Sequence, residues 1–92
     1  MKDYSKSLEI NKRSYIAFNN RGVSNFKLKN YISALEDFKK SLEINPRNYN
    51  TLYNKSLTHF ELQEIKKACI DLKKSIKLGK EVFRGEYLKI CL

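Results

Sequence analysis

The chain is 92 residues long, enough for one small domain, and its 41% apolar content with five Phe and six Tyr favours a folded core over disorder. Three Gly and one Pro are too few for a turn-rich sheet fold, and no apolar run approaches the roughly 18 residues that a membrane span needs. The net charge of +9 comes from 15 Lys and only four Arg, so it does not by itself indicate nucleic-acid binding.

A twelve-residue string recurs along the chain. The string "DYSKSLEINKRS" at 3–14 returns as "DFKKSLEINPRN" at 37–48, with eight of twelve positions identical, and more loosely as "DLKKSIKLGKEV" at 71–82. Both steps are therefore 34 residues. A fixed period of this length is typical of stacked copies of one small structural unit.

Apolar residues within each unit recur at every third or fourth position, which indicates two amphipathic helices per unit. In chain order we expect the second helix of a partial unit at 1–14, full units at 15–48 and 49–82, and a closing helix at 83–92. The whole chain, 1–92, should then form one all-α domain of about six helices.

The ends of these helices carry the residues that usually begin or end a helix. Three side chains can accept backbone hydrogen bonds at a first turn: Ser14, Asn30 and Asn48. Pro46 disfavours helical geometry at the residue before it, and Gly79 can adopt the left-handed conformation that ends a helix.

The first full unit, 15–48, resembles a tetratricopeptide repeat. The matching residues are Phe18, Gly22, Tyr31, Ala34, Phe38, Ser41 and Pro46. The second unit, 49–82, is a more diverged copy, and its matching residues are Leu52, Ser56, Ile65, Ala68, Leu72 and Ser75. The resemblance implies a right-handed solenoid of helical hairpins. Small residues in each hairpin should let its two helices approach closely.

The chain departs from the family pattern at a few equivalent places in the two units. Arg21 and Lys55 replace the usual Leu, and Asn25 and His59 replace the usual Tyr. Lys80 replaces the closing Pro of the second unit. We expect His59 to be a partly buried imidazole packed where an aromatic ring usually lies.

The resemblance implies that the first helices of the units line a concave groove that receives a peptide or a partner helix. The expected groove residues are Asn19, Asn20, Val23, Phe26, Lys27, Asn50, Tyr53, Asn54, Leu57, Phe60 and Arg84, with Ile16, Glu61, Tyr87 and Leu88 beside them. Asn side chains can both donate to and accept from an extended peptide backbone, and the aromatic and Leu side chains can form apolar pockets. Asn20 and Asn54, and also Phe26 and Phe60, could instead have structural roles.

Some members of the family grip a terminal carboxylate with convergent Lys, Arg and Asn side chains. Only Asn54 matches that set here, so we do not expect this clamp. The lysines of the second helices should lie on the outer, convex face, where a solvated surface is the favoured interpretation. Nucleic-acid binding by that basic face is a less favoured alternative, and self-association through the unpaired N-terminal helix is another.

The remaining chemistry points to a non-enzymatic protein-interaction scaffold without metal or cofactor. The single His, His59, has no nucleophile or paired carboxylates placed with it by spacing, and no Gly-rich phosphate loop is present. Cys69 and Cys91 lie 22 positions apart, and we expect two reduced thiols, with a disulfide or metal site as the alternative. The polar N-terminus resembles no signal peptide, so we expect a cytoplasmic protein and no membrane association.

Overall fold

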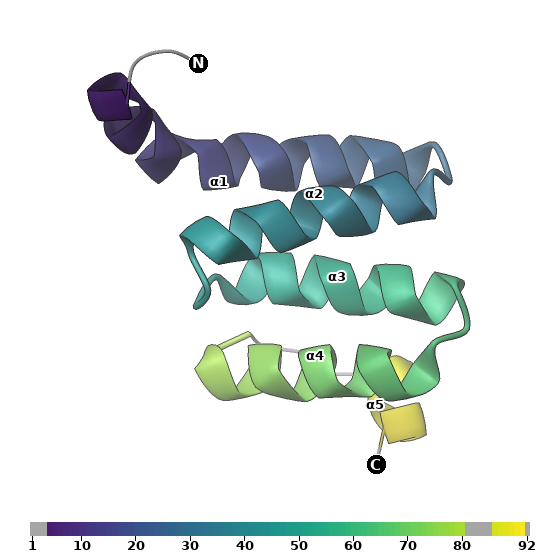
Figure 1. Cartoon of the computed structure of the whole chain (residues 1–92). Helices are drawn as coiled ribbons and strands as arrows, with labels where there is room; N and C mark the ends of the chain where they lie inside the picture. The colour runs from purple at the N-terminus through teal and green to yellow at the C-terminus, as the bar shows by residue number, and fades with distance from the viewer. Residues whose placement is uncertain (1–3, 81–85, 92) are drawn as a thin grey trace.

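A computed structural model describes residues 4–80 and 86–91, and the side chains of 14–80 and 89–91. Its helices are α1 (Tyr4–Lys27), α2 (Tyr31–Ile44), α3 (Tyr49–Glu61), α4 (Ile65–Leu78) and α5 (Glu86–Cys91). The described residues include no strand. The first four helices pack as consecutive antiparallel hairpins, α1 with α2 and α3 with α4 (Figure 1). The predicted all-α solenoid of helical hairpins is confirmed.

The turns inside the two hairpins are built in the same way. Lys29 and Gln63, which are 34 positions apart, both have a left-handed backbone, with φ of 67° and 65°. The N–H of the following residue then reaches back to the carbonyl of Asn25 or His59, at 2.8 Å in both turns. These bonds satisfy carbonyl groups that the end of a helix leaves unpaired. The sequence period therefore extends to the backbone conformation.

Two of the predicted helix boundaries are confirmed in detail. The Asn48 side chain accepts hydrogen bonds from the N–H groups of Asn50 and Thr51, which caps α3. Gly79 has a φ of 128° and follows the last residue of α4. Asn30 precedes α2 as expected, but its side chain makes no capping bond.

The predicted break at Ser14 is wrong. Helix α1 runs through Ser14 without interruption, so the described residues form five helices rather than the expected six. The physical reason lies two residues earlier. Within the second copy of the string the chain has Pro46, but 34 positions earlier it has Lys12, which donates its N–H and continues a helix.

The hairpins are held close by small residues, as expected. A Cβ placed on Gly22 would lie 2.5 Å from a ring carbon of Phe38, and the Phe38 side chain is fully buried. Ser56, Ala68 and Leu72 are likewise fully buried in the second hairpin. Adding bulk at such a contact costs about 1–3 kcal/mol. The approach of α1 to α2 therefore depends on Gly22.

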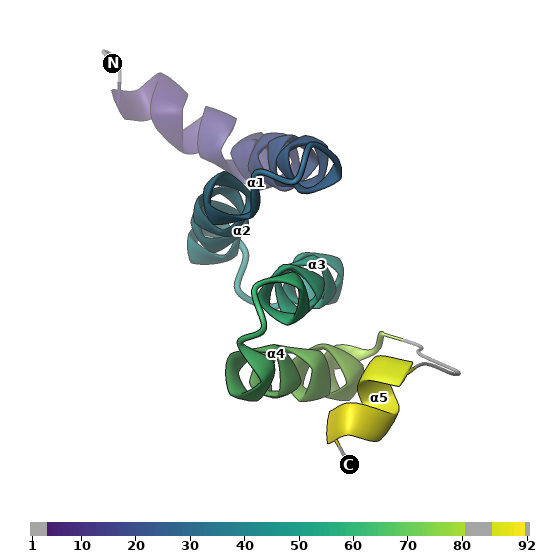
Figure 2. The same cartoon turned by 90° about the vertical axis from the view of Figure 1, so that its right-hand side faces the viewer.

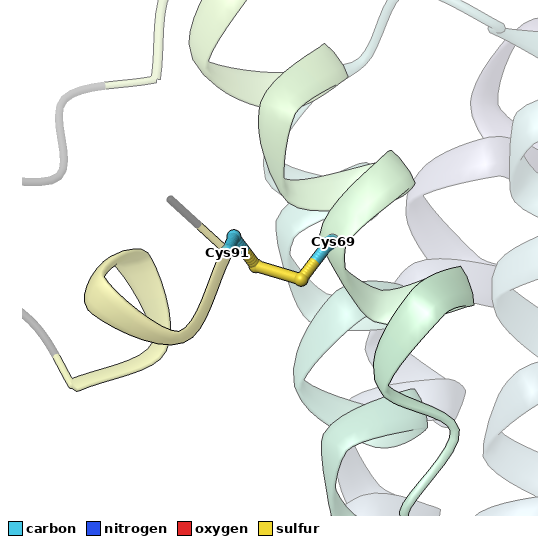
Figure 3. Close-up of a disulfide and its surroundings, with 2 residues drawn as sticks. All are labelled: Cys69 and Cys91. Carbon is cyan, nitrogen blue, oxygen red and sulfur yellow. A yellow bond between two sulfur atoms is a disulfide. The ribbon is translucent and has the colours of Figure 1, made fainter.

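The expectation of two reduced thiols is wrong. Cys69 in α4 and Cys91 in α5 form a disulfide, with a Cα–Cα distance of 5.3 Å (Figure 3). The two positions are distant in sequence, but α5 returns to lie against α4 and brings its cysteine beside the core formed by Phe60, Ala68 and Leu72. Because disulfides are rare in reducing compartments, the cysteines no longer support the predicted cytoplasmic location.

The disulfide closes a loop of 22 residues, so its removal should lower the free energy of unfolding by about 3 kcal/mol. We expect this loss in a Cys69→Ser, Cys91→Ser double variant, measured by urea unfolding followed by circular dichroism. The wild type with a reductant should behave like the variant, and the variant should not respond to the reductant. Equal midpoints for the oxidised wild type and the variant would contradict the disulfide.

Candidate functional site

The first helices of the two hairpins lie on one side of the stack and the second helices on the other. Seen roughly along the axes of α2 and α3, most of α1, together with α3 and α5, lies on one side, α2 lies on the other, and α4 crosses the view obliquely below α3 (Figure 2). Between α1 and α3 lies a pocket of about 160 Å³ lined by Val23, Phe26, Phe38, Asn54 and Leu57. Four of these five residues are among the expected groove residues. Phe38 is the exception, and it belongs to the core of the first hairpin.

The amide groups of the groove join the two units to each other. The Asn19 Oδ1 accepts a hydrogen bond from Thr51 Oγ1 at 3.1 Å and another from Asn54 Nδ2 at 3.2 Å. Thr51 is fully buried, so this bridge fixes the spacing between α1 and α3. The Asn54 backbone carbonyl accepts a hydrogen bond from Thr58 Oγ1 at 2.8 Å, whereas its side-chain Oδ1 accepts none from another described side chain. Asn19 and Asn54 therefore have a structural role, and Asn54 Oδ1 remains as one acceptor beside the pocket.

Lys80 contributes to the α3 side of the groove, which was not expected. Its Nζ donates to Asn50 Oδ1 at 3.1 Å and lies 4.9 Å from the centre of the Tyr53 ring. Such a contact between a cation and an aromatic ring is worth about 0.5–1 kcal/mol at an exposed site. Sequence reasoning identified Lys80 only as the replacement for a closing Pro, and it is the path of the chain after Gly79 that brings its side chain to α3.

The other expected groove residues lie outside the pocket. Asn20 and Lys27 are exposed on α1. Phe60 is 7% exposed and packs with Ala68 and Leu72, so it belongs mainly to the core of the second hairpin. Arg84 lies outside the described residues, as do the side chains of Tyr87 and Leu88. Ile16 is half exposed, and Glu61 lies near Tyr31, whose pKa is raised by burial and then by the Glu61 charge.

The departures from the family pattern in the first hairpin surround a buried carboxylate. Asp37 of α2 is 3% exposed. The Arg21 guanidinium donates to both of its oxygens, with a shortest distance of 2.7 Å, and Asn25 Nδ2 donates at 2.9 Å. The hydrogen bond to Asp37 raises the pKa of Arg21 further. Residues that usually form an apolar contact are thus replaced by partners for Asp37.

The second hairpin has the same arrangement 34 positions later. Lys55 Nζ lies 3.5 Å and His59 Nε2 3.7 Å from Asp71 Oδ2. Burial raises the pKa of the Asp71 carboxyl, and the charges of Lys55 and His59 oppose that shift. The other ring nitrogen, His59 Nδ1, lies 2.7 Å from Glu64 Oε1, and this hydrogen bond lowers the pKa of Glu64. We name these two clusters the first triad (Arg21, Asn25, Asp37) and the second triad (Lys55, His59, Asp71).

The second triad lies at the floor of a cleft between α2 and α4, on the side of the molecule that we call its back. Helices α2 and α4 do not contact each other among the described residues, and the space between them exposes part of α3. Two neighbouring hollows of about 430 and 240 Å³ occupy this space and share Lys39, Lys55 and Asp71. We call them together the back cleft. Its complete lining is Lys39, Leu42, Glu43, Pro46, Leu52, Lys55, His59, Lys67, Ile70, Asp71 and Lys74.

The residues that the structure describes provide neither a metal site nor a membrane-spanning helix. No group of three or more His, Cys, Asp or Glu side chains there could hold a metal ion. None of the described helices is both long and apolar enough to span a bilayer.

Asp71 should make the stability of the protein depend on pH in a recognisable direction. Its folded-state pKa is raised above the ordinary 3.8, so the folded state binds the proton more tightly than the unfolded state. The free energy of unfolding of the wild type, relative to an Asp71→Asn variant, should fall as the pH rises above 3.8. Urea unfolding at a series of pH values measures this difference. Glu36→Gln, on the exposed surface of α2, is the matched control. If the free energy of unfolding of the wild type, relative to Asp71→Asn, rises with pH instead, the raised pKa of Asp71 is contradicted.

Comparison with known protein families agrees with the geometry. One tetratricopeptide repeat model matches residues 15–48, and a second tetratricopeptide repeat model matches residues 49–79. No curated protein matches the chain. The two matches follow one another along the chain, cover more than half of it, and coincide with the two helical hairpins. The chain therefore belongs to the tetratricopeptide repeat family.

Proposed function

We propose that this protein binds an extended peptide segment of a partner in the groove between α1 and α3, without catalysing a reaction. Tetratricopeptide repeats are generally protein–protein interaction modules, and they are typically non-enzymatic. The observation that carries the proposal is the pocket that combines Val23, Phe26 and Leu57 with the amide of Asn54. It joins an apolar hollow to a polar group in one place, as peptide-binding sites commonly do.

The size of the pocket suggests what it would take. A protein cavity of about 150 Å³ is large enough for benzene. The 160 Å³ pocket therefore suits one branched aliphatic or small aromatic side chain of the ligand. The side-chain Oδ1 of Asn54 would then accept a backbone N–H of the same peptide, and Lys80 beside Tyr53 would favour an acidic group further along.

The experiment is a selection of peptides from a random phage-displayed library on the wild type, followed by affinity measurement with synthetic peptides. Leu57→Glu places a charge at the pocket wall and should weaken the selected peptides by about tenfold or more, because that carboxylate would be desolvated on binding. Circular dichroism confirms that the variant is folded.

A matched control is Lys73→Glu, which introduces the same side chain at an exposed position of α4 away from the groove. The selected peptides should bind this variant as they bind the wild type. If they bind Leu57→Glu equally well, or if Lys73→Glu weakens them as much, the groove between α1 and α3 is not their site.

A second candidate function is self-association through the N-terminal residues. The first turns of α1 project beyond the rest of the stack in both views, away from α2 (Figures 1 and 2). A second copy packed there would give a symmetric dimer. Light scattering across a concentration series should then show a rise in molar mass, which a variant lacking residues 1–13 would not show. A constant monomer mass would remove this candidate.

A further inference from the structure

The back of the molecule has an uneven distribution of charge. Helix α4 carries five lysines on its exposed surface, namely Lys66, Lys67, Lys73, Lys74 and Lys77. Its only acidic residue, Asp71, is 8% exposed and is paired with Lys55 inside the second triad. The outer surface of α4 is therefore positive along its length, and its one carboxylate does little to offset it.

The back cleft concentrates this charge between two helices. Lys39 lies on the α2 wall, Lys67 and Lys74 lie on the α4 wall, and all three are exposed. Lys55, at the floor of the cleft, is paired with Asp71, and the Lys55 side chain is only 18% exposed. Its charge is therefore largely neutralised. Glu43 is the remaining acidic residue of the lining. Glu64, which is bonded to His59, lies near Lys39 and Lys67 and offsets part of their charge. An elongated ligand in this cleft would thus meet lysines from both sides.

The cleft also offers apolar surface. Ile70 is 66% exposed and lies in the same hollow as Lys67, although a side chain of this kind is usually buried. Leu42, Pro46 and Leu52 line the other hollow. Lysines around apolar side chains are suited to a ligand that carries both negative charges and an apolar group.

We propose that the back cleft binds an acidic, extended segment of a partner protein, with an apolar side chain of that segment placed against Ile70. A second copy of this chain is a poor occupant of this cleft, because the chain has only ten Asp and Glu residues, and two of them, Asp37 and Asp71, are buried. A flat bilayer cannot enter a cleft between two helices. Nucleic acid is disfavoured because the lining has neither Arg for bidentate phosphate contacts nor an aromatic ring apart from His59 on which bases could stack.

The probe is a fluorescein-labelled, glutamate-rich peptide with one central leucine, and its binding is measured by fluorescence anisotropy at low salt. In the cleft variant, Lys39, Lys67 and Lys74 are all changed to Glu. In the control variant, the exposed residues Lys40, Lys66 and Lys77 on the same two helices are changed to Glu. Both variants have the same net charge, so the comparison separates the cleft from long-range attraction.

We expect the cleft variant to lose about tenfold or more in affinity, because each new carboxylate would face the acidic ligand, and the control to lose less than about threefold. Changing the same sets of lysines to Ala gives a second pair of variants without new charges, in case the Glu variants lose helicity. The Leu57→Glu variant should bind the probe as the wild type does, which separates this site from the groove.

Ile70 allows a sharper test. Ile70→Ser should weaken the binding of the leucine-containing peptide by about three- to tenfold through lost apolar contact, and should not affect the binding of a peptide with Ala in place of Leu.

The proposal is overturned if the probe does not bind the wild type, if both charge variants weaken its binding equally, or if Ile70→Ser affects both peptides alike. It is also overturned if single-stranded RNA or phosphatidylserine vesicles bind more tightly than the peptide in a cleft-dependent manner.

Discussion

The contact between Gly22 and the Phe38 ring sets how closely the two helices of the first hairpin can approach. A Cβ at Gly22 would overlap the ring, so the residue type and the helix spacing are tied together. This spacing brings Asp37 beneath Arg21 and Asn25, where its carboxylate is buried and fully engaged. In the second hairpin the equivalent positions are Ser56 and Leu72, both fully buried, and Asp71 is placed beside Lys55 and His59. Close packing and the buried carboxylates are thus two results of one constraint.

The contact between the units has a different chemical character. Within a hairpin the helices meet mainly through apolar and small residues, whereas α1 and α3 are bridged by Asn19, Thr51 and Asn54. Hydrogen bonds have directional geometry, so this bridge fixes the rotation of one hairpin against the next as well as their distance. The pocket beside Asn54 therefore has a defined shape. The groove and the back cleft are two faces of the same inter-unit junction, one on the α1 and α3 side and the other between α2 and α4.

Much of the fold could be predicted from the sequence because the information was periodic. The 34-residue repeat, the apolar spacing, Pro46 and Gly79 locate four of the helices, and Val23, Phe26, Asn54 and Leu57 do line one pocket. The error at Ser14 came from extending the period to a place where the chain has Lys12 instead of a proline equivalent to Pro46. Phe60 was assigned to the groove, but it packs with Ala68 and Leu72 in the core of the second hairpin.

Other features could not be predicted because they depend on contacts between distant parts of the chain. The disulfide requires the return of α5 onto α4, and the position of Lys80 requires the path after α4. The triads are an intermediate case. Their signal was present in the sequence, since Arg21 and Lys55, Asn25 and His59, and Asp37 and Asp71 are each separated by 34 residues. It was not recognised because the substitutions were considered as losses of apolar packing rather than as partners for the aspartates.

The triads also bear on how such a protein can be altered. Each aspartate has its partners within its own unit, so duplicating or transplanting a whole unit would carry a satisfied carboxylate with it. Grafting a single first helix that bears the usual Leu and Tyr would instead leave the aspartate of the host hairpin buried and alone, which costs about 3–5 kcal/mol. The smallest segment that can be transplanted without leaving a buried aspartate unpaired is consequently the entire hairpin. A single first helix from another member of the family cannot replace the equivalent helix of this protein.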